Sequence, residues 1–365
     1  MKILFYNPLQ KSFMFEWQQM HFLDEMPRYG VSFDIINPLE YESFERANEE
    51  IVNKMKKGGY DLFMSTPCFP EYIFPETLSF VKKMGLPSLC FRPDNLSVPM
   101  RDKEVAPLFD LVWLTAPETK YLYDKWGAKT IVLPYAANPF VYTMQDMPQK
   151  NGICFIGTPH GARPKILNEL ANNKITVDVY CKSQSNSVQN INDINLQAEN
   201  RWRTVIHRLA FAEGRKVLMG NLFHKCTTST VLSKSPYLNI LPRLSFEDMI
   251  ATYTEYSLSL SFTSYGNTDL LKKPLNVINL RNFEVPMCGG LQICRYSEEM
   301  AAYFENGKEI VMYESTEEMV DKVKYYLNVV SQSEIAEMKR CARKRAESDH
   351  SWKCRFNKLF NELGI

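Results

Sequence analysis

Short apolar runs alternate with longer segments of helical spacing along the first 140 residues. The apolar runs are bounded by Asn, Pro or Gly, which is typical of buried strands. Strand, helix and strand in this order predict parallel pairing, because two parallel strands need a crossover of about a dozen residues. We therefore expect a doubly wound α/β sheet, with strands at 3–7, 33–37, 61–65, 88–91, 111–115 and 130–133.

The same rhythm restarts after a polar stretch that follows Pro134 and Pro139. Two prolines and a polar run between two rhythmic halves are typical of a linker. The second half predicts another Rossmann-like unit, with strands at 153–157, 175–180, 237–242, 257–262, 291–294 and 310–313. We expect an N-terminal domain over 1–140, a linker over 141–151, a C-terminal domain over 152–345 and a C-terminal helix over 346–365 that packs near the domain junction.

Two segments do not follow the simple rhythm. Residues 182–235 are polar and rich in Asn, Ser and Gln, and we interpret them as an insertion with one helix at 202–211. Residues 335–363 are charged and helical in pattern throughout. Helix starts are marked elsewhere by Ser245 and by Ser315 with Glu318, the second of which has the spacing of a capping box.

Composition narrows the class of protein. The chain has 365 residues, 45% hydrophobic and 23% charged, which indicates a globular protein of about two domains. Its 43 Lys and Arg against 42 Asp and Glu give a formal net charge of +1, so a nucleic-acid partner is not expected and membrane contact would be peripheral at most. Nine cysteines without a C-x-x-C pair argue against disulfides and structural zinc. Without a signal peptide or an 18-residue apolar run, a cytoplasmic location is expected.

Ligands of doubly wound sheets bind beyond the carboxyl ends of the strands, where helix N-termini present unpaired N–H groups. With two such sheets, we expect the ligand in the cleft where the two domains face each other. Residues that would reach this cleft from the first domain are Asn7, Thr66, Asp94 and Thr115; the second would contribute the loops after Gly157, after Phe262 and before Glu284.

The loop 157–164 has the composition of an anion site. Gly157 and Gly161 permit close backbone approach, and Arg163 adds a fork of donors for phosphate at a helix start. The alternative is a tight turn in which Arg163 is simply solvated. His160 is a second candidate donor, or a turn residue with no special function.

Glu284 lies two residues before Pro286, which places its carboxylate near a helix start. There it would accept two hydrogen bonds from a vicinal diol such as a ribose. The alternatives are that Glu284 complements the helix dipole or pairs with Arg281 three residues away.

Several motifs in order carry a family resemblance: 281–290 (RNFEVPMCGG), 303–310 (YFENGKEI) and 324–327 (KYYL), with supporting matches at 155–157, Arg163 and 244–249. Over residues 236–356 the chain resembles the C-terminal domain of CgeB-type glycosyltransferases. The resemblance implies the GT-B fold, in which two Rossmann-like domains face each other across a cleft and a C-terminal helix crosses the junction.

The resemblance also implies roles for single residues. Glu284 would bind the ribose hydroxyls of a nucleotide, Arg281 and Arg163 would neutralise the diphosphate, and residues near Leu244 would present backbone groups to the base. Asn276 stands where many GT-B enzymes have a glutamate that contacts the donor sugar. No D-x-D follows a predicted strand, so we expect a metal-independent enzyme with no tightly bound cofactor.

An inverting enzyme needs a general base for the acceptor hydroxyl, expected from the first domain. Asp94, just after a predicted strand, is the first candidate, and Glu16 and His21 follow. Asp94 could instead cap the next segment, Glu16 could be surface charge and His21 a buried, hydrogen-bonded histidine. The basic run Lys339–Arg345 could contact anionic lipid or form a solvated helix face.

The resemblance implies transfer of a sugar from a UDP-, GDP- or dTDP-sugar to an acceptor hydroxyl on a glycan, protein or lipid-linked molecule, as in glycoprotein or surface-polysaccharide synthesis. Two alternatives remain open at this point. One is a nucleotide-sugar epimerase of the same fold, and the other is a non-catalytic module that binds nucleotide or glycan, which Asn276 favours. Transfer to modified bases in DNA has little support from the net charge.

Overall fold

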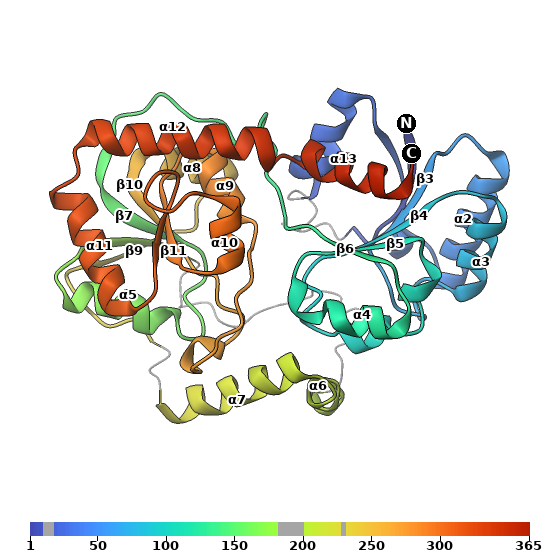
Figure 1. Ribbon diagram of the computed structural model, residues 1–365, viewed down its shortest axis with the longest axis horizontal. Helices are drawn as coiled ribbons and strands as arrows, with labels where there is room; N and C mark the ends of the chain where they lie inside the picture. The colour runs from blue at the N-terminus through green and yellow to red at the C-terminus, as the bar shows by residue number, and fades with distance from the viewer. Residues whose placement is uncertain (10–17, 182–200, 228–230) are drawn as a thin grey trace. The chain divides into compact units, whose positions relative to one another are not determined.

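The computed structural model describes residues 1–9, 18–181, 201–227 and 231–365. They form two compact units (Figure 1). Unit 1 contains residues 1–141 and 351–365, and unit 2 contains residues 142–350. The chain therefore ends in the unit in which it begins.

Unit 1 is built on a six-stranded sheet with the order β2-β1-β3-β4-β5-β6. Every pair of neighbouring strands in it is parallel. The strands are β1 (Lys2–Tyr6), β2 (Ser32–Ile36), β3 (Leu62–Ser65), β4 (Ser88–Arg92), β5 (Leu111–Leu114) and β6 (Thr130–Val132).

Unit 2 repeats this plan, with the order β12-β11-β10-β7-β8-β9 and parallel pairing throughout. Its strands are β7 (Lys150–Ile156), β8 (Val177–Tyr180), β9 (Leu238–Leu241), β10 (Tyr256–Ser261), β11 (Gln292–Arg295) and β12 (Val311–Tyr313). The twelve strands expected from the apolar runs are all confirmed, with shifts of up to three residues at their ends.

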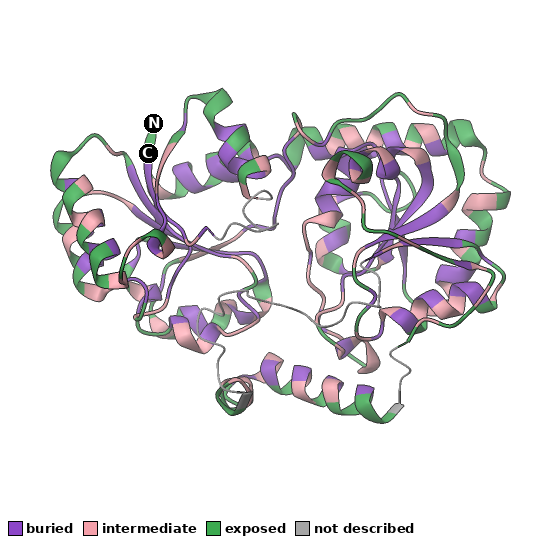
Figure 2. Cartoon of the chain, turned by 180° about the vertical axis from the view of Figure 1, so that it is seen from behind, coloured by how far each residue is buried: buried purple, intermediate pink, exposed green. Residues whose placement is uncertain are grey.

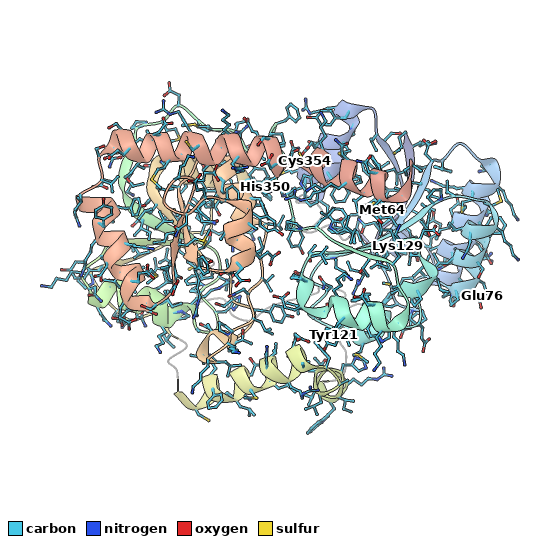
Figure 3. The ribbon with its side chains drawn as sticks, viewed as in Figure 1. Met64, Glu76, Tyr121, Lys129, His350 and Cys354 are labelled. Atoms are coloured by element: carbon cyan, nitrogen blue, oxygen red, sulfur yellow. The ribbon has the colours of Figure 1, made fainter. Side chains whose placement is uncertain are left out.

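Helices flank both sheets, so that the strands are buried and the outer helix faces are exposed (Figure 2). Figure 3 shows the contrast for Met64, inside β3, and Glu76, exposed in the first turn of α3. The helices of unit 1 are α2 (Phe44–Lys57), α3 (Pro75–Lys83), α4 (Lys120–Trp126) and α13 (Trp352–Leu363). Those of unit 2 are α5 (Arg163–Asn172), α6 (Arg201–Leu209), α7 (Ala212–Thr227), α8 (Phe246–Glu255), α9 (Arg281–Met287), α10 (Glu298–Tyr303), α11 (Thr316–Asn328) and α12 (Gln332–Asp349).

Serine side chains begin many of these helices. The hydroxyls of Ser245 and Ser315 accept hydrogen bonds from the N–H groups of Asp248 and Glu318, as the sequence predicts. At α12, Ser331 and Glu334 satisfy each other's backbone N–H groups in a full capping box. These caps fix where the crossover helices start, and hence the length of the loops that precede them.

The helical pattern over 335–363 covers two helices, and the expected C-terminal helix over 346–365 begins later than predicted. α12 ends at Asp349, and Ser351 caps a separate helix, α13, by accepting from the N–H of Cys354. α13 is part of the core of unit 1: Trp352 and Phe356 are fully buried against Phe22. The chain thus leaves unit 2 after α12 and returns to unit 1.

The expected single helix in the polar insertion also needs correction. Two helices lie there, α6 and α7, and the second was not predicted. α7 has apolar residues on all sides, so its sequence lacks the periodic signal on which the prediction relied. Residues 182–200 and 228–230 of the insertion lie outside the described residues. No helix in the described part of the chain has the length and hydropathy to cross a bilayer.

Candidate functional site

The strand order of unit 2 identifies where a ligand would bind. From β7 the chain adds β8 and β9 on one side and then β10, β11 and β12 on the other. The order therefore reverses between β7 and β10, and such switch points are where doubly wound sheets bind ligands, beyond the carboxyl ends of the strands. The loops that follow β7 and β10 are the predicted loops after Gly157 and Phe262.

Three cationic or titratable side chains gather at this point. Gly157 follows β7 directly, and a Cβ at this glycine would lie only 3.0 Å from the Arg281 guanidinium. Arg163 begins α5 a few residues later, and His160 lies between them. The structure thus brings together Gly157, His160, Arg163 and Arg281, although Gly157 and Arg281 are 124 residues apart in the sequence.

The positive charge of this cluster is not neutralised. The Arg281 guanidinium has no hydrogen-bond or ion-pair partner among the described residues, and Arg163 donates only to the carbonyl oxygen of Thr158, at 3.0 Å. Desolvation and the charge of Arg281 lower the pKa of Arg163 to about 10. Desolvation and the two guanidinium groups also lower the pKa of His160. A bound anion would reverse each of these effects.

Glu284 lies inside α9 and is only 5% exposed. The Tyr142 hydroxyl donates a hydrogen bond of 2.9 Å to Glu284 Oε1. The alternative in which Arg281 neutralises Glu284 is not what the structure shows, because these two residues form no ion pair. The Tyr142 hydroxyl thus holds one oxygen of this carboxylate, and Arg281 is not engaged by it.

Two asparagines position the start of α9. Asn279 accepts from the N–H of Arg281 at 3.1 Å, and Asn282 accepts from the N–H of Asn279 at 2.9 Å. The Asn279 amide also donates to the carbonyl oxygen of Phe262, at the end of β10. Arg281 is thereby fixed to the strand end where the candidate ligand would lie.

Further polar groups at the site were not predicted from the sequence. Buried oxygen atoms of Tyr253, Thr263, Asn267 and Asp269 have no hydrogen-bond partner among the described residues, and neither has Oδ1 of Asn276, a candidate that the sequence did indicate. Buried polar atoms without partners are rare and mark places where a ligand or water completes the bonding. Only the clustering of short polar side chains after β10 could have indicated this from the sequence.

A pocket of about 280 Å³ opens beside these residues, at the carboxyl ends of β10, β11 and β12. It is lined by Phe262, Thr263, Asp269, Arg295 and Tyr313, among others. A smaller hollow shares Phe262 and Asp269 with it and extends to His160 and Arg163. The cationic cluster therefore borders open space.

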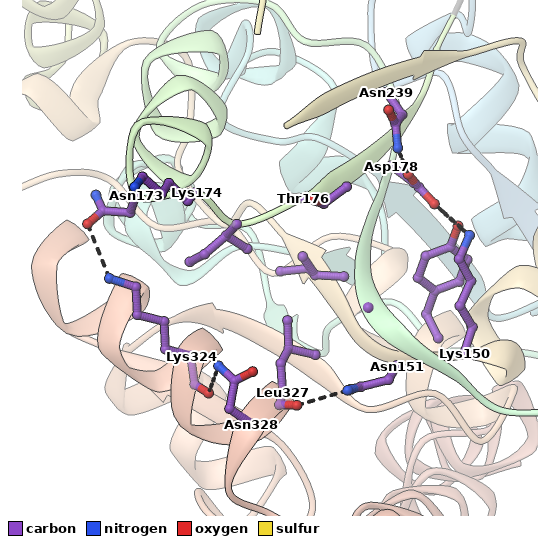
Figure 4. A pocket seen from close by; sticks show the side chains of 14 residues that line it. Lys150, Asn151, Asn173, Lys174, Thr176, Asp178, Asn239, Lys324, Leu327 and Asn328 are labelled. Carbon is purple, nitrogen blue, oxygen red and sulfur yellow. Dashed lines mark hydrogen bonds and ion pairs between the residues drawn. The ribbon is translucent and has the colours of Figure 1, made fainter. Parts of the chain in front are cut away.

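A larger pocket, of about 430 Å³, lies at the opposite edge of the same sheet (Figure 4). The polar groups around Asp178 are already satisfied: Lys150 and Asn239 each donate to Asp178 at 2.7 Å, and Tyr256 also donates to it. Burial opposes the ionisation of Asp178, but these hydrogen bonds outweigh it and hold the pKa of Asp178 below its usual range. This pocket adjoins the amino ends of β7 and β8, where doubly wound sheets do not bind ligands.

The remaining candidates of unit 2 lie along the same sheet edge. Leu244 follows β9 and directly precedes Ser245, the cap of α8. Gly161 has a positive φ of 65°, and a Cβ there would lie 2.6 Å from Asn267 Oδ1. Gly161 therefore lets the loop after β7 approach the loop after β10 closely.

In unit 1, Asp94 follows β4, is exposed, and has a positive φ of 53°. The Tyr135 hydroxyl donates to its carboxylate at 3.1 Å. Asn7 and Thr66, which follow β1 and β3 at the switch point of this sheet, hydrogen-bond to each other at 2.6 Å. Thr115 is bound through its N–H to Asn95.

The other two candidate bases differ from Asp94. His21 is fully buried, and its Nδ1 accepts from the indole N–H of Trp352 at 2.8 Å. This is the geometry of a packed core histidine and does not favour a role as general base. Glu16 lies outside the described residues.

The basic run at Lys339–Arg345 is not a free cationic face. Lys339 is buried and donates to the carbonyl oxygen of Thr254, and burial lowers its pKa to about 8. Arg340 and Arg345 form ion pairs with Glu337 and Asp349. Within the described residues, no group of three or more His, Cys, Asp or Glu side chains is placed to hold a metal ion.

Comparison with known proteins relates this geometry to a fold. HepE from Anabaena, solved in complex with UDP, is 10% identical, with each chain covered over 100% of its length and a TM-score of 0.59. Sucrose-phosphate synthase from Thermosynechococcus elongatus is 11% identical, covering 99% of this chain and 98% of that one, with a TM-score of 0.55. An alpha-glucosyltransferase in complex with UDP and a 13-mer DNA is 10% identical, with full coverage and a TM-score of 0.59.

The chain has the GT-B fold. A family model described as glycosyl transferase-like matches residues 201–361, which include Glu284 and Arg281. No curated protein sequence matches the chain. The expected GT-B fold is thus confirmed, whereas the CgeB-type subfamily remains a prediction from the motifs.

Proposed function

We propose that this protein is a glycosyltransferase that uses a nucleotide-sugar donor. The observation that carries the proposal is the cluster of Arg163, Arg281 and His160 against Gly157. Neither of its two guanidinium groups, at the switch point of a GT-B sheet, forms an ion pair with a described residue. The diphosphate of a nucleotide sugar has the charge and the oxygen atoms that such a cluster lacks.

The chemistry of transfer requires that the departing nucleoside diphosphate be stabilised as its bond to the sugar breaks. Arg163 and Arg281 would bind the oxygens of the leaving group, and the N–H groups at the start of α5 would add a favourable dipole. Because these residues supply the positive charge, the reaction proposed here does not depend on a metal ion.

Glu284 would bind the ribose by accepting hydrogen bonds from its hydroxyls. Tyr142 holds the carboxylate in place, so less rotational freedom is lost on binding. Support comes from the glycosyl transferase-like match over this segment and from neighbours solved with UDP and UDP-glucose.

Asp94 is proposed as the base that takes the proton of the acceptor hydroxyl. Asp94 is an exposed residue that follows β4 at the carboxyl edge of the unit 1 sheet, and the Tyr135 hydroxyl donates to its carboxylate. Local desolvation raises the pKa of this carboxyl group, although the Tyr135 hydrogen bond and the charge of Arg92 oppose the rise. His21, by contrast, is fully buried. Exchange of Asp94 for Asn should lower kcat without weakening donor binding.

The direct test is to incubate the purified chain with UDP-, GDP- and dTDP-sugars and acceptors and to measure nucleotide release. Exchange of Glu284 for Gln should lower kcat/KM by about ten- to one-hundred-fold, since it removes charged hydrogen bonds to the ribose. Glu298→Gln, at an exposed glutamate in the first turn of α10, is the matched control. Equal release by the Glu284 variant and the wild type would contradict the role of Glu284.

Product analysis separates the alternatives. Conversion of the donor without acceptor would identify an epimerase. Thermal stabilisation by nucleotide without turnover of any donor would instead identify a binding module. The unpartnered Asn276 Oδ1, in place of a donor-contacting glutamate, makes the second outcome worth measuring.

A further inference from the structure

The helical hairpin of α6 and α7 is a strongly cationic segment of unit 2. Residues 201–227 contain six Lys and Arg and one Glu, for a formal charge of +5, whereas the whole chain carries only +1. Arg203, Arg208, Arg215, Lys216 and Lys225 form no ion pair with another described residue. This contrasts with the paired basic residues of α12.

The hairpin also exposes apolar side chains in regular order. Trp202, Ile206 and Leu209 are spaced by four and three residues, so they share one face of α6, and they are 75%, 62% and 53% exposed. Thr204 and His207, toward the other face, are less exposed. α6 therefore packs with its polar side inward, the reverse of an ordinary surface helix.

α7 continues this surface. Met219, Leu222 and Phe223, again three and four residues apart, are each at least half exposed. Arg215 and Lys216, one turn earlier, border the same face. In Figure 2 the exposed colour follows both helices.

The hairpin is anchored firmly to the rest of unit 2. A Cβ at Gly214 would lie 2.2 Å from the carbonyl oxygen of Arg208, so this glycine lets α7 approach α6. A Cβ at Gly220 would lie 2.7 Å from the carbonyl oxygen of Asn267, so α7 contacts the loop after β10. Asn221 accepts a hydrogen bond from Asn267 at 2.8 Å. The apolar surface is thus presented by a packed scaffold.

We propose that the α6–α7 hairpin docks on the surface of an anionic lipid bilayer. Exposed Trp, Ile, Leu and Phe side chains would enter the interface between headgroups and acyl chains, while the Lys and Arg side chains would contact the lipid phosphates. Charge alone would suit a nucleic acid equally well. The ordered apolar face selects the bilayer, because phosphate backbones offer no apolar surface to cover it.

The test is co-sedimentation of the full chain with vesicles of phosphatidylcholine, with and without phosphatidylglycerol. We expect binding only to the anionic vesicles, with weaker binding as the salt concentration rises. Ile206→Ser with Leu209→Ser should weaken binding about ten-fold or more, and each charge removed by Arg203→Gln or Lys225→Gln about five-fold.

Matched controls lie in the same unit. Val329→Ser removes an apolar side chain that is 68% exposed, and Arg340→Gln with Lys344→Gln removes two charges from α12. Both should bind vesicles like the wild type. All substituted residues other than Arg340 lack ion pairs, so unchanged thermal unfolding is expected and would show that each variant is folded.

Three outcomes would overturn the proposal: no binding of the wild type to anionic vesicles, equal binding to vesicles of phosphatidylcholine alone, or equal weakening by the α12 controls. Binding to duplex DNA that is insensitive to Ile206→Ser and Leu209→Ser, without vesicle binding, would instead show a site for an anionic polymer. A dimer in solution that these two substitutions dissociate, without vesicle binding, would show a self-association surface. Turnover of the nucleotide-sugar donor is measured without lipid, and vesicle binding is measured without donor. The proposed enzymatic function and the proposed membrane docking can therefore fail independently.

Discussion

Arg163 and Arg281, the first residues of α5 and α9, show how single residues would prepare the proposed anion site. Arg281 lies against Gly157, which has no side chain to displace it, and Asn279 fixes the helix start that carries it. Desolvation lowers the pKa of Arg163, which means that the folded protein holds this charge at a cost. Binding of an anion would remove that cost, so the site is poised for a negatively charged ligand.

Exchange of Gly157 for Ala tests this arrangement. The new Cβ would lie 3.0 Å from the Arg281 guanidinium, at a φ of 151° that L residues rarely adopt. We expect Arg281 to be displaced and the affinity for nucleoside diphosphates to fall about ten-fold, the effect of losing one charge-assisted contact. Isothermal titration calorimetry with a nucleoside diphosphate measures this change in affinity.

The matched control is Gly127→Ala in unit 1, where φ is also positive but no atom lies within 4 Å. The free energy of unfolding of the Gly127 variant should fall by about as much as that of the Gly157 variant, because both place a side chain at a positive φ. Its affinity for nucleotide should stay that of the wild type. Equal affinities for the Gly157 variant and the wild type would show that Arg281 does not depend on this glycine.

Sequence patterns predicted part of the site, and physical reasons explain the rest. Gly157, His160 and Arg163 share one loop, so their proximity could be predicted from spacing, and Glu284 was found at a helix start. Tyr142 and Tyr253 were missed because an aromatic residue on an apolar face usually packs in the core. Only tertiary contacts show that the Tyr142 hydroxyl donates to Glu284 and that the Tyr253 hydroxyl is buried without a partner.

At the scale of elements, α13 joins the two ends of the chain in one core. Glu25 is fully buried, and its carboxylate accepts from the N–H groups of Trp352 and Lys353 at the start of α13. Arg355 donates to the carbonyl oxygens of Pro134 and Tyr135, and Lys129 pairs with Glu362. The last helix is therefore a structural part of unit 1.

Glu25 makes the packing of α13 within unit 1 sensitive to pH. Burial raises the pKa of Glu25 from 4.5 to about 7, although the two backbone N–H groups oppose the rise. Between these values the folded state binds more protons than the unfolded state, so this residue's contribution is full below pH 4.5 and is lost as the pH rises through 7. The contribution is up to about 3 kcal/mol.

We expect Glu25→Gln, which cannot titrate, to flatten the dependence of stability on pH between 4.5 and 7. Urea unfolding followed by Trp fluorescence at a series of pH values measures this, because Trp352 lies beside Glu25. Glu362→Gln, on the exposed side of the same helix, should keep the slope of the wild type. A wild-type slope in the Glu25 variant would contradict the assignment.

Element prediction worked best where burial imposes a period. All twelve strands followed from apolar runs bounded by turn residues. The C-terminal helix was expected to begin at residue 346, before α13 does, because the helical pattern continues across the end of α12; the cap at Ser351 marks the true start. α7 was missed because its apolar residues do not form one stripe. Some of them pack inward, whereas Met219, Leu222 and Phe223 lie on its exposed face.

For the whole molecule, the proposed function divides its tasks between the two units. Unit 2 carries the cationic cluster, Glu284 and the α6–α7 hairpin, while unit 1 carries the proposed base Asp94. The net charge of +1 conceals this division, since the hairpin alone carries +5. Inferences from whole-chain charge, including the low expectation of an anionic partner, therefore need the distribution of charge as well.

The central claim is that the cluster at Arg163 and Arg281 binds a diphosphate. Calorimetric titration of the wild type with uridine and guanosine, and with their 5′-mono- and diphosphates, tests it most directly. We predict that the diphosphate of the preferred base binds at least about one-hundred-fold more tightly than the nucleoside. Arg281→Ala and Arg163→Ala should abolish most of this difference, and Arg340→Ala in α12 should leave it unchanged. Equal affinities for nucleoside and diphosphate, or an undiminished difference in both site variants, would contradict the account.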